Sequence, residues 1–358
     1  MTTKEKILDA LRNVIDPDLD KDIVSLNMIS DIIIDGKNIK FTFTLTTPAC
    51  PLKDYLRKSC VSAIHEHVGT DFNVEIDMTS KVTSHRAENE ELLTDVKNII
   101  AVASGKGGVG KSTVSVNLAI ALANKGAKVG LIDADIYGPS IPIMFGMIDE
   151  NPFTRKKNGR DMIVPMEKFG IKLLSIGFFV DKSTALIWRG PMATMALKQL
   201  LTDADWGMLD YMIIDLPPGT GDIPLTLVES FPLTGAIIVT TPQKVAIADV
   251  RKSADMFNNE KIRIPILGIV ENMSFFTPAD NPETKYHIFG KNGGSEFALE
   301  LGVPLLAQLP ITPEISASGD EGRPLVTNTN STISAEFMQL AEKVAQQIAI
   351  HNSKKEKS

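Results

Sequence analysis

The stretch Gly105-Lys106-Gly107-Gly108-Val109-Gly110-Lys111-Ser112-Thr113 decides the fold of this chain. It follows an apolar run over residues 99–104, typical of a buried strand, and precedes residues 114–122, which favour a helix. A strand, a glycine-rich loop and a helix in this order are the setting in which such a loop binds phosphate. The glycines let backbone N–H groups close around an anion, and the helix N-terminus adds the positive end of its dipole. We therefore predict a phosphate-binding loop over residues 105–113.

This loop carries two lysines, although a phosphate loop needs only one. We expect Lys111 to reach the β- and γ-phosphates of a nucleotide, and Ser112 to ligate Mg²⁺. ATP and Mg²⁺ are therefore the predicted cofactors. Lys106 is an additional positive charge that a single phosphate site does not require.

The bulk properties of the chain restrict its class. Its 358 residues suffice for two domains with a sizeable core. A formal charge of −7 and a pI near 5.4 argue against a nucleic-acid binder, which needs a basic face. No apolar run approaches the roughly 18 residues of a membrane span, the N-terminus has no signal-peptide pattern, and two cysteines are too few for a disulfide framework. We expect a soluble cytoplasmic protein.

The N-terminal region, residues 1–82, is predicted to be a small α+β domain. Its expected elements are a helix at 3–15, strands at 29–34 and 39–45, a helix at 52–68 and a strand at 72–79. The charged segment His85-Arg86-Ala87-Glu88-Asn89-Glu90-Glu91 has no apolar period, so residues 83–97 are predicted to be a linker.

From residue 98 onward, apolar strands alternate with helical segments. The expected strands are 99–104, 129–133, 173–176, 211–215, 236–240, 266–272 and 305–309. Such apolar runs suit a mostly parallel, doubly wound sheet with helices on both faces. We predict an α/β P-loop NTPase domain over residues 98–350, followed by a disordered tail over residues 351–358.

Acidic residues stand at the ends of two predicted strands. Asp133 and Asp135 flank one residue, so in an extended backbone their side chains share a face. We predict that Asp133 holds Mg²⁺ through its water shell and that Asp135 orients the attacking water. The alternative is an acidic loop that caps the next segment. Asp215 ends the strand 211–215 and completes, with Ser112 and Asp133, the predicted Mg²⁺ site.

Two further segments follow predicted strands. The loop Leu216-Pro217-Pro218-Gly219-Thr220-Gly221-Asp222 combines stiff prolines with adaptable glycines, which suits a sensor of the γ-phosphate, although a turn with only a structural role has the same composition. Asn272 follows the strand that begins at residue 266. Its amide offers a donor and an acceptor to adenine, or it caps a turn.

At this point the motifs carry a family resemblance. The loop over residues 105–113 resembles the deviant Walker A motif of the MinD, ParA and nitrogenase-iron-protein group. Within that group the chain resembles the Mrp/ApbC family of iron–sulfur cluster carriers over about residues 95–350. The segments that carry this resemblance are Asp133-Ala134-Asp135-Ile136-Tyr137-Gly138-Pro139-Ser140, Trp188-Arg189-Gly190-Pro191-Met192 and Ile213-Ile214-Asp215-Leu216-Pro217-Pro218-Gly219-Thr220-Gly221-Asp222.

The N-terminal region is similar to the PaaD-like domain that often precedes such an ATPase. The stretches Asp16-Pro17-Asp18, Asp22-Ile23-Val24-Ser25-Leu26 and Thr46-Thr47-Pro48-Ala49-Cys50-Pro51 carry this similarity. Together the two resemblances imply a slow, Mg²⁺-dependent ATPase that forms a face-to-face homodimer and delivers iron–sulfur clusters to apoproteins. They also imply that Lys106 reaches the nucleotide of the partner subunit and neutralises transition-state charge there, as an arginine finger does.

One departure from the family pattern concerns the cluster site. Family members commonly carry a Cys-x-x-Cys pair after the Asn-Met-Ser segment, whereas residues 275–290 contain no cysteine. Because thiolates are the usual ligands of iron–sulfur clusters, the shared site at the dimer interface does not carry over. Asp280, Glu283 and His287 are either alternative metal ligands or solvated loop residues.

The two cysteines of the chain lie in the N-terminal region. Cys50 comes just before a predicted helix, whose dipole favours a thiolate, so it is a candidate iron–sulfur ligand in addition to a possible structural residue. Cys60 falls inside that helix and is predicted to be a small core residue. One cysteine per chain holds a cluster only with help from another subunit or a client.

Two other functions fit the same motifs. The first is a MinD-like switch, but residues 334–349 contain only one basic residue, Lys343, and are predicted to be a helix docked on its own domain. The second is a metal-free scaffold or chaperone that presents the apolar segment Ile141-Pro142-Ile143-Met144-Phe145-Gly146-Met147 to a client, unless that segment is buried.

Overall fold

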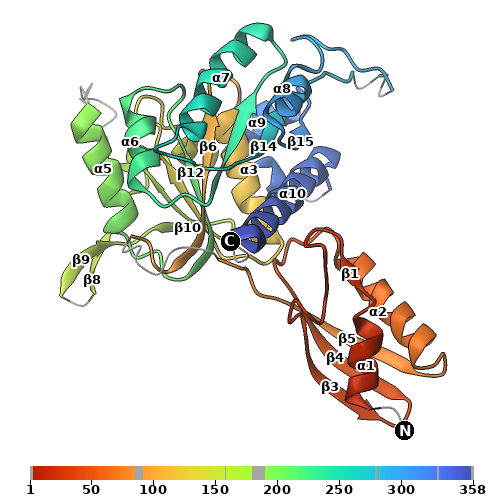
Figure 1. The fold of residues 1–358 in the computed structure, drawn as a ribbon. Helices are drawn as coiled ribbons and strands as arrows, with labels where there is room; N and C mark the ends of the chain where they lie inside the picture. Colours follow the sequence, from red (N-terminus) through yellow and green to blue (C-terminus); the bar gives the residue numbers. More distant parts are fainter. Residues whose placement is uncertain are drawn as a thin grey trace. The chain divides into compact units, whose positions relative to one another are not determined.

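The computed structural model describes residues 3–84, 92–157, 159–179, 190–278, 280–281, 283–328 and 330–355. The chain divides into two compact units: residues 1–85 with 345–358, and residues 86–344. In the ribbon of Figure 1, the elements from α1 to β5 belong to the small unit, and β6 is the first element of the large unit. No helix in the described part of the chain is long and apolar enough to cross a membrane.

The small unit is an α+β fold with a one-sided sheet. Its elements are α1 (Lys4–Leu11), β1 (Ile15–Asp16), β2 (Lys21–Asp22), β3 (Ile29–Asp35), β4 (Asn38–Leu45), α2 (Lys53–His67) and β5 (Asn73–Ser80). In its described residues, β4 pairs antiparallel with β3 and parallel with β5. Every second residue of β4 is buried, so one face of the sheet packs against α1 and α2.

The core of the small unit contains Cys60. This side chain of α2 is fully buried among apolar residues that include Leu56 and Ile64. Burial raises the pKa of the Cys60 thiol to about 12. The prediction of a small core residue at this position is confirmed, and the neutral thiol is a poor metal ligand.

The large unit is built on a mostly parallel sheet. The strands of this unit are β6 (Val96–Ser104), β7 (Val129–Asp133), β8 (Thr154–Lys157), β9 (Arg160–Ile163), β10 (Met166–Lys168), β11 (Ile171–Ser175), β12 (Leu209–Asp215), β13 (Gly235–Thr240), β14 (Ile266–Glu271) and β15 (Leu305–Gln308). Of these, β8 and β9 form a separate hairpin. Over the described residues, the main sheet has the order β10-β11-β7-β12-β6-β13-β14-β15, with β10 antiparallel and the others parallel. The predicted α/β class is confirmed.

Helices cover both faces of this sheet. The helices after β6 are α3 (Lys111–Asn124), α4 (Ile141–Met144), α5 (Gly190–Thr202), α6 (Asp222–Ser230), α7 (Lys244–Asn258), α8 (Gly293–Leu301), α9 (Pro313–Asp320) and α10 (Thr332–Lys355), with 3₁₀ turns at Ile176–Phe178 and Leu325–Thr327. Residues of α10 from 345 on belong to the small unit. One core joins residues of α5, α6, α7 and α8 to alternate strand residues such as Ile99 and Ala101. Their neighbours Ile100 and Val102 point to the other face and are equally buried, and α3 packs against β6, β7 and β12 (Figure 1). Full burial on both faces explains the apolar strand sequences.

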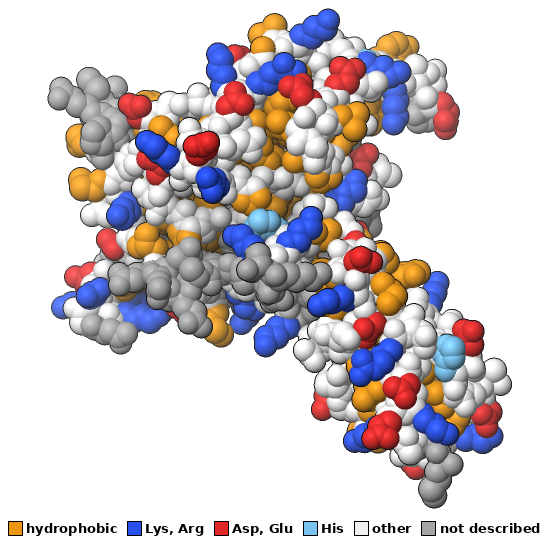
Figure 2. Space-filling model, viewed as in Figure 1, with side chains coloured by type: hydrophobic (Ala, Val, Ile, Leu, Met, Phe, Trp, Pro, Cys, Tyr) orange, Lys and Arg blue, Asp and Glu red, His pale blue; other side chains and the backbone are white. Residues whose placement is uncertain are grey.

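The surface carries charges of both signs, as the 37 basic and 44 acidic residues of the sequence indicate. Figure 2 shows lysine and arginine side chains interspersed with aspartate and glutamate over the described residues of one face. Most of the segment Ile141–Met147 lies in the interior, since Ile141, Phe145 and Met147 are buried and only Ile143 is substantially exposed among its large apolar residues. Burial therefore removes most of the apolar surface that a client would contact here.

The C-terminal helix corrects one prediction. Its apolar positions, including Phe337, Leu340 and Val344, are buried, as expected for a docked helix. However, α10 continues to Lys355, so residues 351–355 are helical and the predicted disordered tail is wrong over this range. Asn352 is 2% exposed and donates a hydrogen bond to the backbone oxygen of Thr83, which fixes the last turns. Residues 356–358 lie outside the described residues.

A hairpin of β8 and β9 was missing from the predicted strands. Lys157 pairs with Arg160 across its turn, and Gly159 has a φ of +79°, as a tight hairpin turn requires. The side chains of this hairpin are mostly exposed and charged, so no apolar alternation marks it in the sequence. Asp205 anchors it: the carboxylate is 5% exposed, pairs with Arg155 and lies 2.6 Å from the Lys157 ammonium.

Replacing Asp205 with asparagine is expected to lower the free energy of unfolding of the large unit by about 1–2 kcal/mol at neutral pH, because both half-exposed cations lose their charged partner. The hydrogen bond from Arg155, followed by that from Lys157, lowers the pKa of Asp205 from its ordinary value of 3.8. The ionised form therefore stabilises the fold above the unfolded pKa, and this contribution is lost as the pH falls through the lower, folded pKa.

Urea unfolding followed by the fluorescence of the buried Trp206 measures this effect. The difference between wild type and Asp205→Asn should be largest near pH 7 and should shrink below about pH 4. Asp161→Asn, on the exposed face of the same hairpin, is the matched control and should change little. A difference that does not vary with pH would contradict an electrostatic anchor.

Candidate nucleotide site

The phosphate loop joins β6 to α3. Two of its glycines occupy positions where a side chain does not fit. Gly110 has a φ of +82°, and a Cβ at this position would lie 2.1 Å from Nδ2 of Asn272. At Gly105 a Cβ would lie 2.3 Å from the backbone nitrogen of Val250 in α7. By contrast, a Cβ at Gly107 or Gly108 meets no atom within 4 Å, so this part of the loop borders open space. The backbone N–H groups of the loop therefore have room for an anion.

Lys111, Ser112 and Asp215 form the centre of the site. Asp215 is fully buried at the end of β12, and its Oδ2 lies 2.8 Å from Nζ of Lys111 and accepts a 2.6 Å hydrogen bond from Oγ of Ser112. Its Oδ1 accepts a second 2.6 Å hydrogen bond from Oγ of Ser115, one turn further along α3. A buried carboxylate of this kind persists because it is paired and fully hydrogen-bonded.

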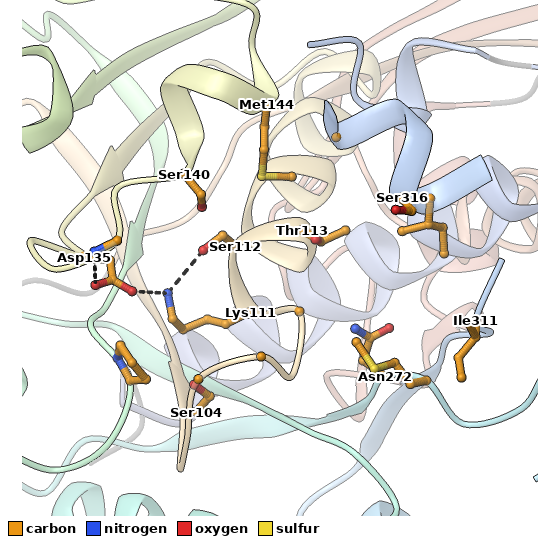
Figure 3. A pocket seen from close by; sticks show the side chains of 18 of the residues that line it. Ser104, Lys111, Ser112, Thr113, Asp135, Ser140, Met144, Asn272, Ile311 and Ser316 are labelled. Carbon is orange, nitrogen blue, oxygen red and sulfur yellow. Dashed lines mark hydrogen bonds and ion pairs between the residues drawn. The ribbon is translucent and has the colours of Figure 1, made fainter. Parts of the chain in front are cut away.

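Asp135, in the loop after β7, approaches the same lysine. Its Oδ2 is 3.9 Å from Nζ of Lys111, and both side chains line the same pocket (Figure 3). Burial raises the pKa of Asp135, while the Lys111 ammonium opposes this effect. The structure therefore brings together Lys111, Ser112, Asp135 and Asp215, although they come from three separate segments.

Asp133 differs from Asp215 in its partners. Both side chains are fully buried, and neither lines the pocket among the described residues. Oδ1 accepts a hydrogen bond from the backbone nitrogen of Asp135, and Oδ2 accepts one from that of Ile141 and a 2.9 Å bond from Oγ of Ser175. Burial, reinforced by the nearby Asp215 carboxylate, raises the pKa of Asp133 to about 7. Through the hydrogen bonds from the backbone nitrogens of Asp135 and Ile141, Asp133 fixes the conformation of the loop that carries Asp135.

The remaining walls of the pocket come from the segment after β7, which the sequence motifs include, and from residues 311–316, which sequence reasoning missed. The pocket measures about 560 Å³ and is lined on this side by Ser140, Met144, Ile311, Ile315 and Ser316, some of which are labelled in Figure 3. Thr312 caps α9 by accepting a hydrogen bond from the backbone nitrogen of Ile315, and Pro313 follows it. A Thr-Pro pair marks a helix start in the sequence, but it does not reveal that this helix borders the phosphate loop.

Asn272 lies at the junction of the loop and the apolar wall. Its Nδ2 donates a 2.8 Å hydrogen bond to the backbone oxygen of Val109, and its side chain lines the pocket. One donor of the amide is therefore used to brace the phosphate loop. The predicted contact of Asn272 with adenine stays a prediction.

The glycine loop after β12 is close to the phosphate loop. Gly219 has a φ of +85° and donates a backbone hydrogen bond of 2.8 Å to the oxygen of Ser104, and Pro218 lines the pocket. The loop therefore borders the pocket and contacts the strand before the phosphate loop, and its role as a sensor of the γ-phosphate stays a prediction.

Lys106 differs from Lys111 in its surroundings. Its half-buried side chain lines the pocket, and Nζ lies 3.4 Å from Oε1 of Gln243. Within the described residues, no carboxylate lies at ion-pair distance from this ammonium. The two lysines of the loop therefore have different partners: Lys111 is neutralised inside the subunit, and Lys106 is not.

The donor set fits a nucleotide with Mg²⁺. A serine hydroxyl and carboxylate oxygens are the ligands that Mg²⁺ prefers, and Ser112 and Asp215 already lie in contact. A lysine and unobstructed loop N–H groups suit phosphate oxygens. These residues could hold Mg²⁺ and the phosphates without a new cluster of side chains being assembled.

The other predicted metal ligands are not among the residues that line this pocket. His287 donates a 3.0 Å hydrogen bond from Nδ1 to the backbone oxygen of Ser274, and Asp280 and Glu283 are exposed. Cys50 is half-buried just before α2 in the small unit. The described residues contain no group of three or more His, Cys, Asp or Glu side chains arranged to hold a metal ion. Trp188 and Arg189 lie outside the described residues.

The fold and the site together define a P-loop NTPase. Residues 95–345 match the family described as NUBPL iron-transfer P-loop NTPases, and residues 4–78 match the iron-sulfur cluster assembly protein family. The chain therefore belongs to the NUBPL-type iron-transfer P-loop NTPase family. The resemblance found in the motifs is thereby confirmed.

Curated relatives span both units. An iron-sulfur cluster carrier protein of Synechocystis is 44% identical over 350 residues, covering 98% of each chain, and one of Helicobacter pylori is 38% identical over 359 residues, covering all of this chain and 95% of the relative. Among solved structures, a nucleotide-binding protein from Archaeoglobus fulgidus in complex with ADP is 36% identical, with a TM-score of 0.59, and covers 69% of this chain and 95% of that one.

Proposed function

We propose that this protein is an ATP-dependent carrier of iron–sulfur clusters that acts as a homodimer and delivers clusters to apoproteins. The observation that carries this proposal is similarity at 44% identity, across both units, to a protein named an iron-sulfur cluster carrier. The cluster is the cargo, and the nucleotide is the cofactor that controls it. The cytoplasm is the predicted compartment.

For the nucleotide, each residue has a role that its surroundings support. Ser112 and Asp215 would hold Mg²⁺ and Lys111 would bind the phosphates. For Asp133 to act on the water shell, as the sequence predicts, one of its hydrogen bonds from Ser175 or the backbone would have to give way. Asp135 would orient the attacking water, because its carboxylate reaches the pocket beside Lys111. Bound Mg²⁺ would supply charge neutralisation at the phosphates. We expect slow turnover that depends on Mg²⁺.

For the cargo, the chain offers one accessible thiol. The sequence contains only Cys50 and Cys60, and Cys60 is buried with a raised pKa. Two copies of Cys50 from a homodimer, together with ligands from a client, would hold a cluster only transiently. The lack of further cysteines also favours a second candidate, a metal-free scaffold switched by nucleotide.

Anaerobic reconstitution with iron and sulfide separates these two functions. We expect wild type to bind iron and sulfide and to restore the visible absorption of an added apo-ferredoxin, and we expect Cys50→Ser to lose most of the bound iron. Cys60→Ala is the matched control and should retain the iron, because its thiol is buried and neutral. Wild type that binds no cluster under any condition favours the scaffold, and full binding by Cys50→Ser rejects the role of Cys50.

A further inference from the structure

Glu271 is a buried carboxylate that none of the roles above uses. It is the last residue of β14, is fully buried, and directly precedes Asn272 in the pocket wall. Burying an ionised carboxylate costs several kcal/mol unless its oxygens are satisfied. Its contacts therefore indicate what it holds in place.

Three groups from three segments donate hydrogen bonds to this carboxylate. Oε1 accepts a 2.5 Å bond from Oγ of Ser274 and a 2.8 Å bond from Nε2 of Gln308, and Oε2 accepts a 2.5 Å bond from the backbone nitrogen of Gly294. Gly294 lies in the first turn of α8, where the positive end of the helix dipole favours a carboxylate. No hydrogen bond or ion pair with a cation is found for Glu271 in the described residues.

The residue at position 294 shows how closely the carboxylate is packed. A Cβ at Gly294 would lie 2.8 Å from Cβ of Glu271 and 3.0 Å from its Oε2. Any larger residue would push the start of α8 away from the end of β14. The contact of Glu271 with α8 thus depends on this glycine.

The hydrogen bond from Ser274 to Glu271 spans a strained segment. Met273, which lies between them and lines the pocket, has a φ of +55°, a left-handed conformation that is unfavourable for a non-glycine residue. The flanking backbone is also fixed, because the nitrogen of Asn272 donates to the oxygen of Thr240 and that of Ser274 to the oxygen of Leu309. Strain of this kind persists only where surrounding contacts impose it.

The strained segment rests on the phosphate loop. Asn272 donates to the oxygen of Val109, and its Nδ2 occupies the space that a side chain at position 110 would need. Asn272 and Met273 therefore form a wall between the phosphate loop and the apolar side of the pocket, where Ile311 lies. A nucleotide whose phosphates sit on the loop would place its base against this wall.

We propose that Glu271 is a positioning residue for the base of the nucleotide: it fixes Asn272 and Met273 in the conformation that contacts the base. This inference rests on the proposed nucleotide-binding function. In this role Glu271 makes no contact with the phosphates. The consequence is selective: weakening the Glu271 contacts affects ligands that carry a base and spares ligands that consist of phosphates alone.

Calorimetric titration of Glu271→Gln with ADP and with Mg²⁺-tripolyphosphate tests this inference. The glutamine is nearly isosteric, but its NH₂ group faces at least one of the three donors, so the segment loses part of its support. We expect the Kd for ADP to rise about tenfold, the effect of one lost charge-assisted hydrogen bond, while the Kd for tripolyphosphate stays within about twofold. Glu296→Gln, an exposed position in the first turn of α8, is the matched control and should bind both ligands as wild type does.

The remaining outcomes are distinct. If wild type binds neither ligand, the proposed nucleotide function is wrong. If Glu271→Gln binds ADP normally, or loses both ligands equally, the positioning role is overturned. Should Glu271→Gln fail to fold, Ser274→Ala removes one donor only and must give the same selective loss, with a smaller rise in the Kd for ADP.

Discussion

Replacing Lys111 with alanine is expected to weaken ATP binding by about a hundredfold or more. The lysine is 6% exposed and lies at the centre of the pocket, so its ammonium would contact phosphate oxygens in a poorly hydrated setting. A charge-assisted hydrogen bond there contributes about 3 kcal/mol, which corresponds to this loss in affinity. No other described lysine occupies the space between Asp135 and Asp215.

The variant also changes the protein without nucleotide. Asp215 would keep its hydrogen bonds from Ser112 and Ser115 but lose its cation, so thermal unfolding is needed to show that the large unit remains folded. Lys125→Ala is the matched control, because this lysine follows the same helix and pairs with Glu342 at 2.5 Å, outside the pocket. Calorimetric titration with ATP should separate the two variants. A folded Lys111→Ala protein with the affinity of wild type would refute the assigned phosphate contact.

The convergence of these residues was predictable from the order of strands and acids. Parallel strands end at one edge of a sheet, so a loop after β6 and a carboxylate at the end of β12 meet wherever the two strands are neighbours. The sequence reveals each strand through its apolar run and each acid through its position. Lys111, Ser112 and Asp215 could therefore be placed together before any coordinates were known.

The state of Asp133 could not be predicted in the same way. Its position at the end of β7 is as regular as that of Asp215, yet its oxygens are taken by two backbone nitrogens and by Ser175 of β11. Which hydrogen-bond partners each of two similar carboxylates finds depends on the path of the loop that follows each strand. Loop paths are set by such long-range hydrogen bonds, which leave no periodic signal in the sequence.

The wall formed by Ile311 and α9 has a related explanation. These residues are about 200 positions away from the phosphate loop in the sequence, and the pairing of β14 with β15 brings them to it. Similarly, α10 extends past its predicted end because Asn352 finds a partner in Thr83. In both cases tertiary contacts determine where an element lies or ends, and the local sequence does not.

Lys106, unlike Lys111, has no carboxylate partner among the described residues, and its replacement is expected to affect hydrolysis rather than binding. Lys106→Ala is expected to leave the Kd for ATP within about threefold of wild type and to reduce kcat for hydrolysis by at least about a hundredfold. The reason is that Lys106 has only Gln243 as a side-chain partner among the described residues, so it is available to a partner subunit's nucleotide. A cation supplied across an interface stabilises transition-state charge and typically contributes a factor of 10³ or more.

Mixing two inactive variants tests whether Lys106 acts across a dimer. Lys106→Ala keeps the phosphate contact of Lys111, and Lys111→Ala keeps Lys106, so a mixed dimer contains one site with both lysines. Hydrolysis should therefore reappear when the two variants are combined, up to about half the activity of wild type per mixed dimer, and it should depend on total protein concentration as subunit association does. Lys252→Ala, an exposed lysine of α7, serves as the control for the loss of a surface charge and should hydrolyse ATP as wild type does. Normal turnover by Lys106→Ala alone excludes the role of Lys106 in catalysis, whereas inactivity of every mixture, although both variants fold and associate, places Lys106 within its own subunit's site.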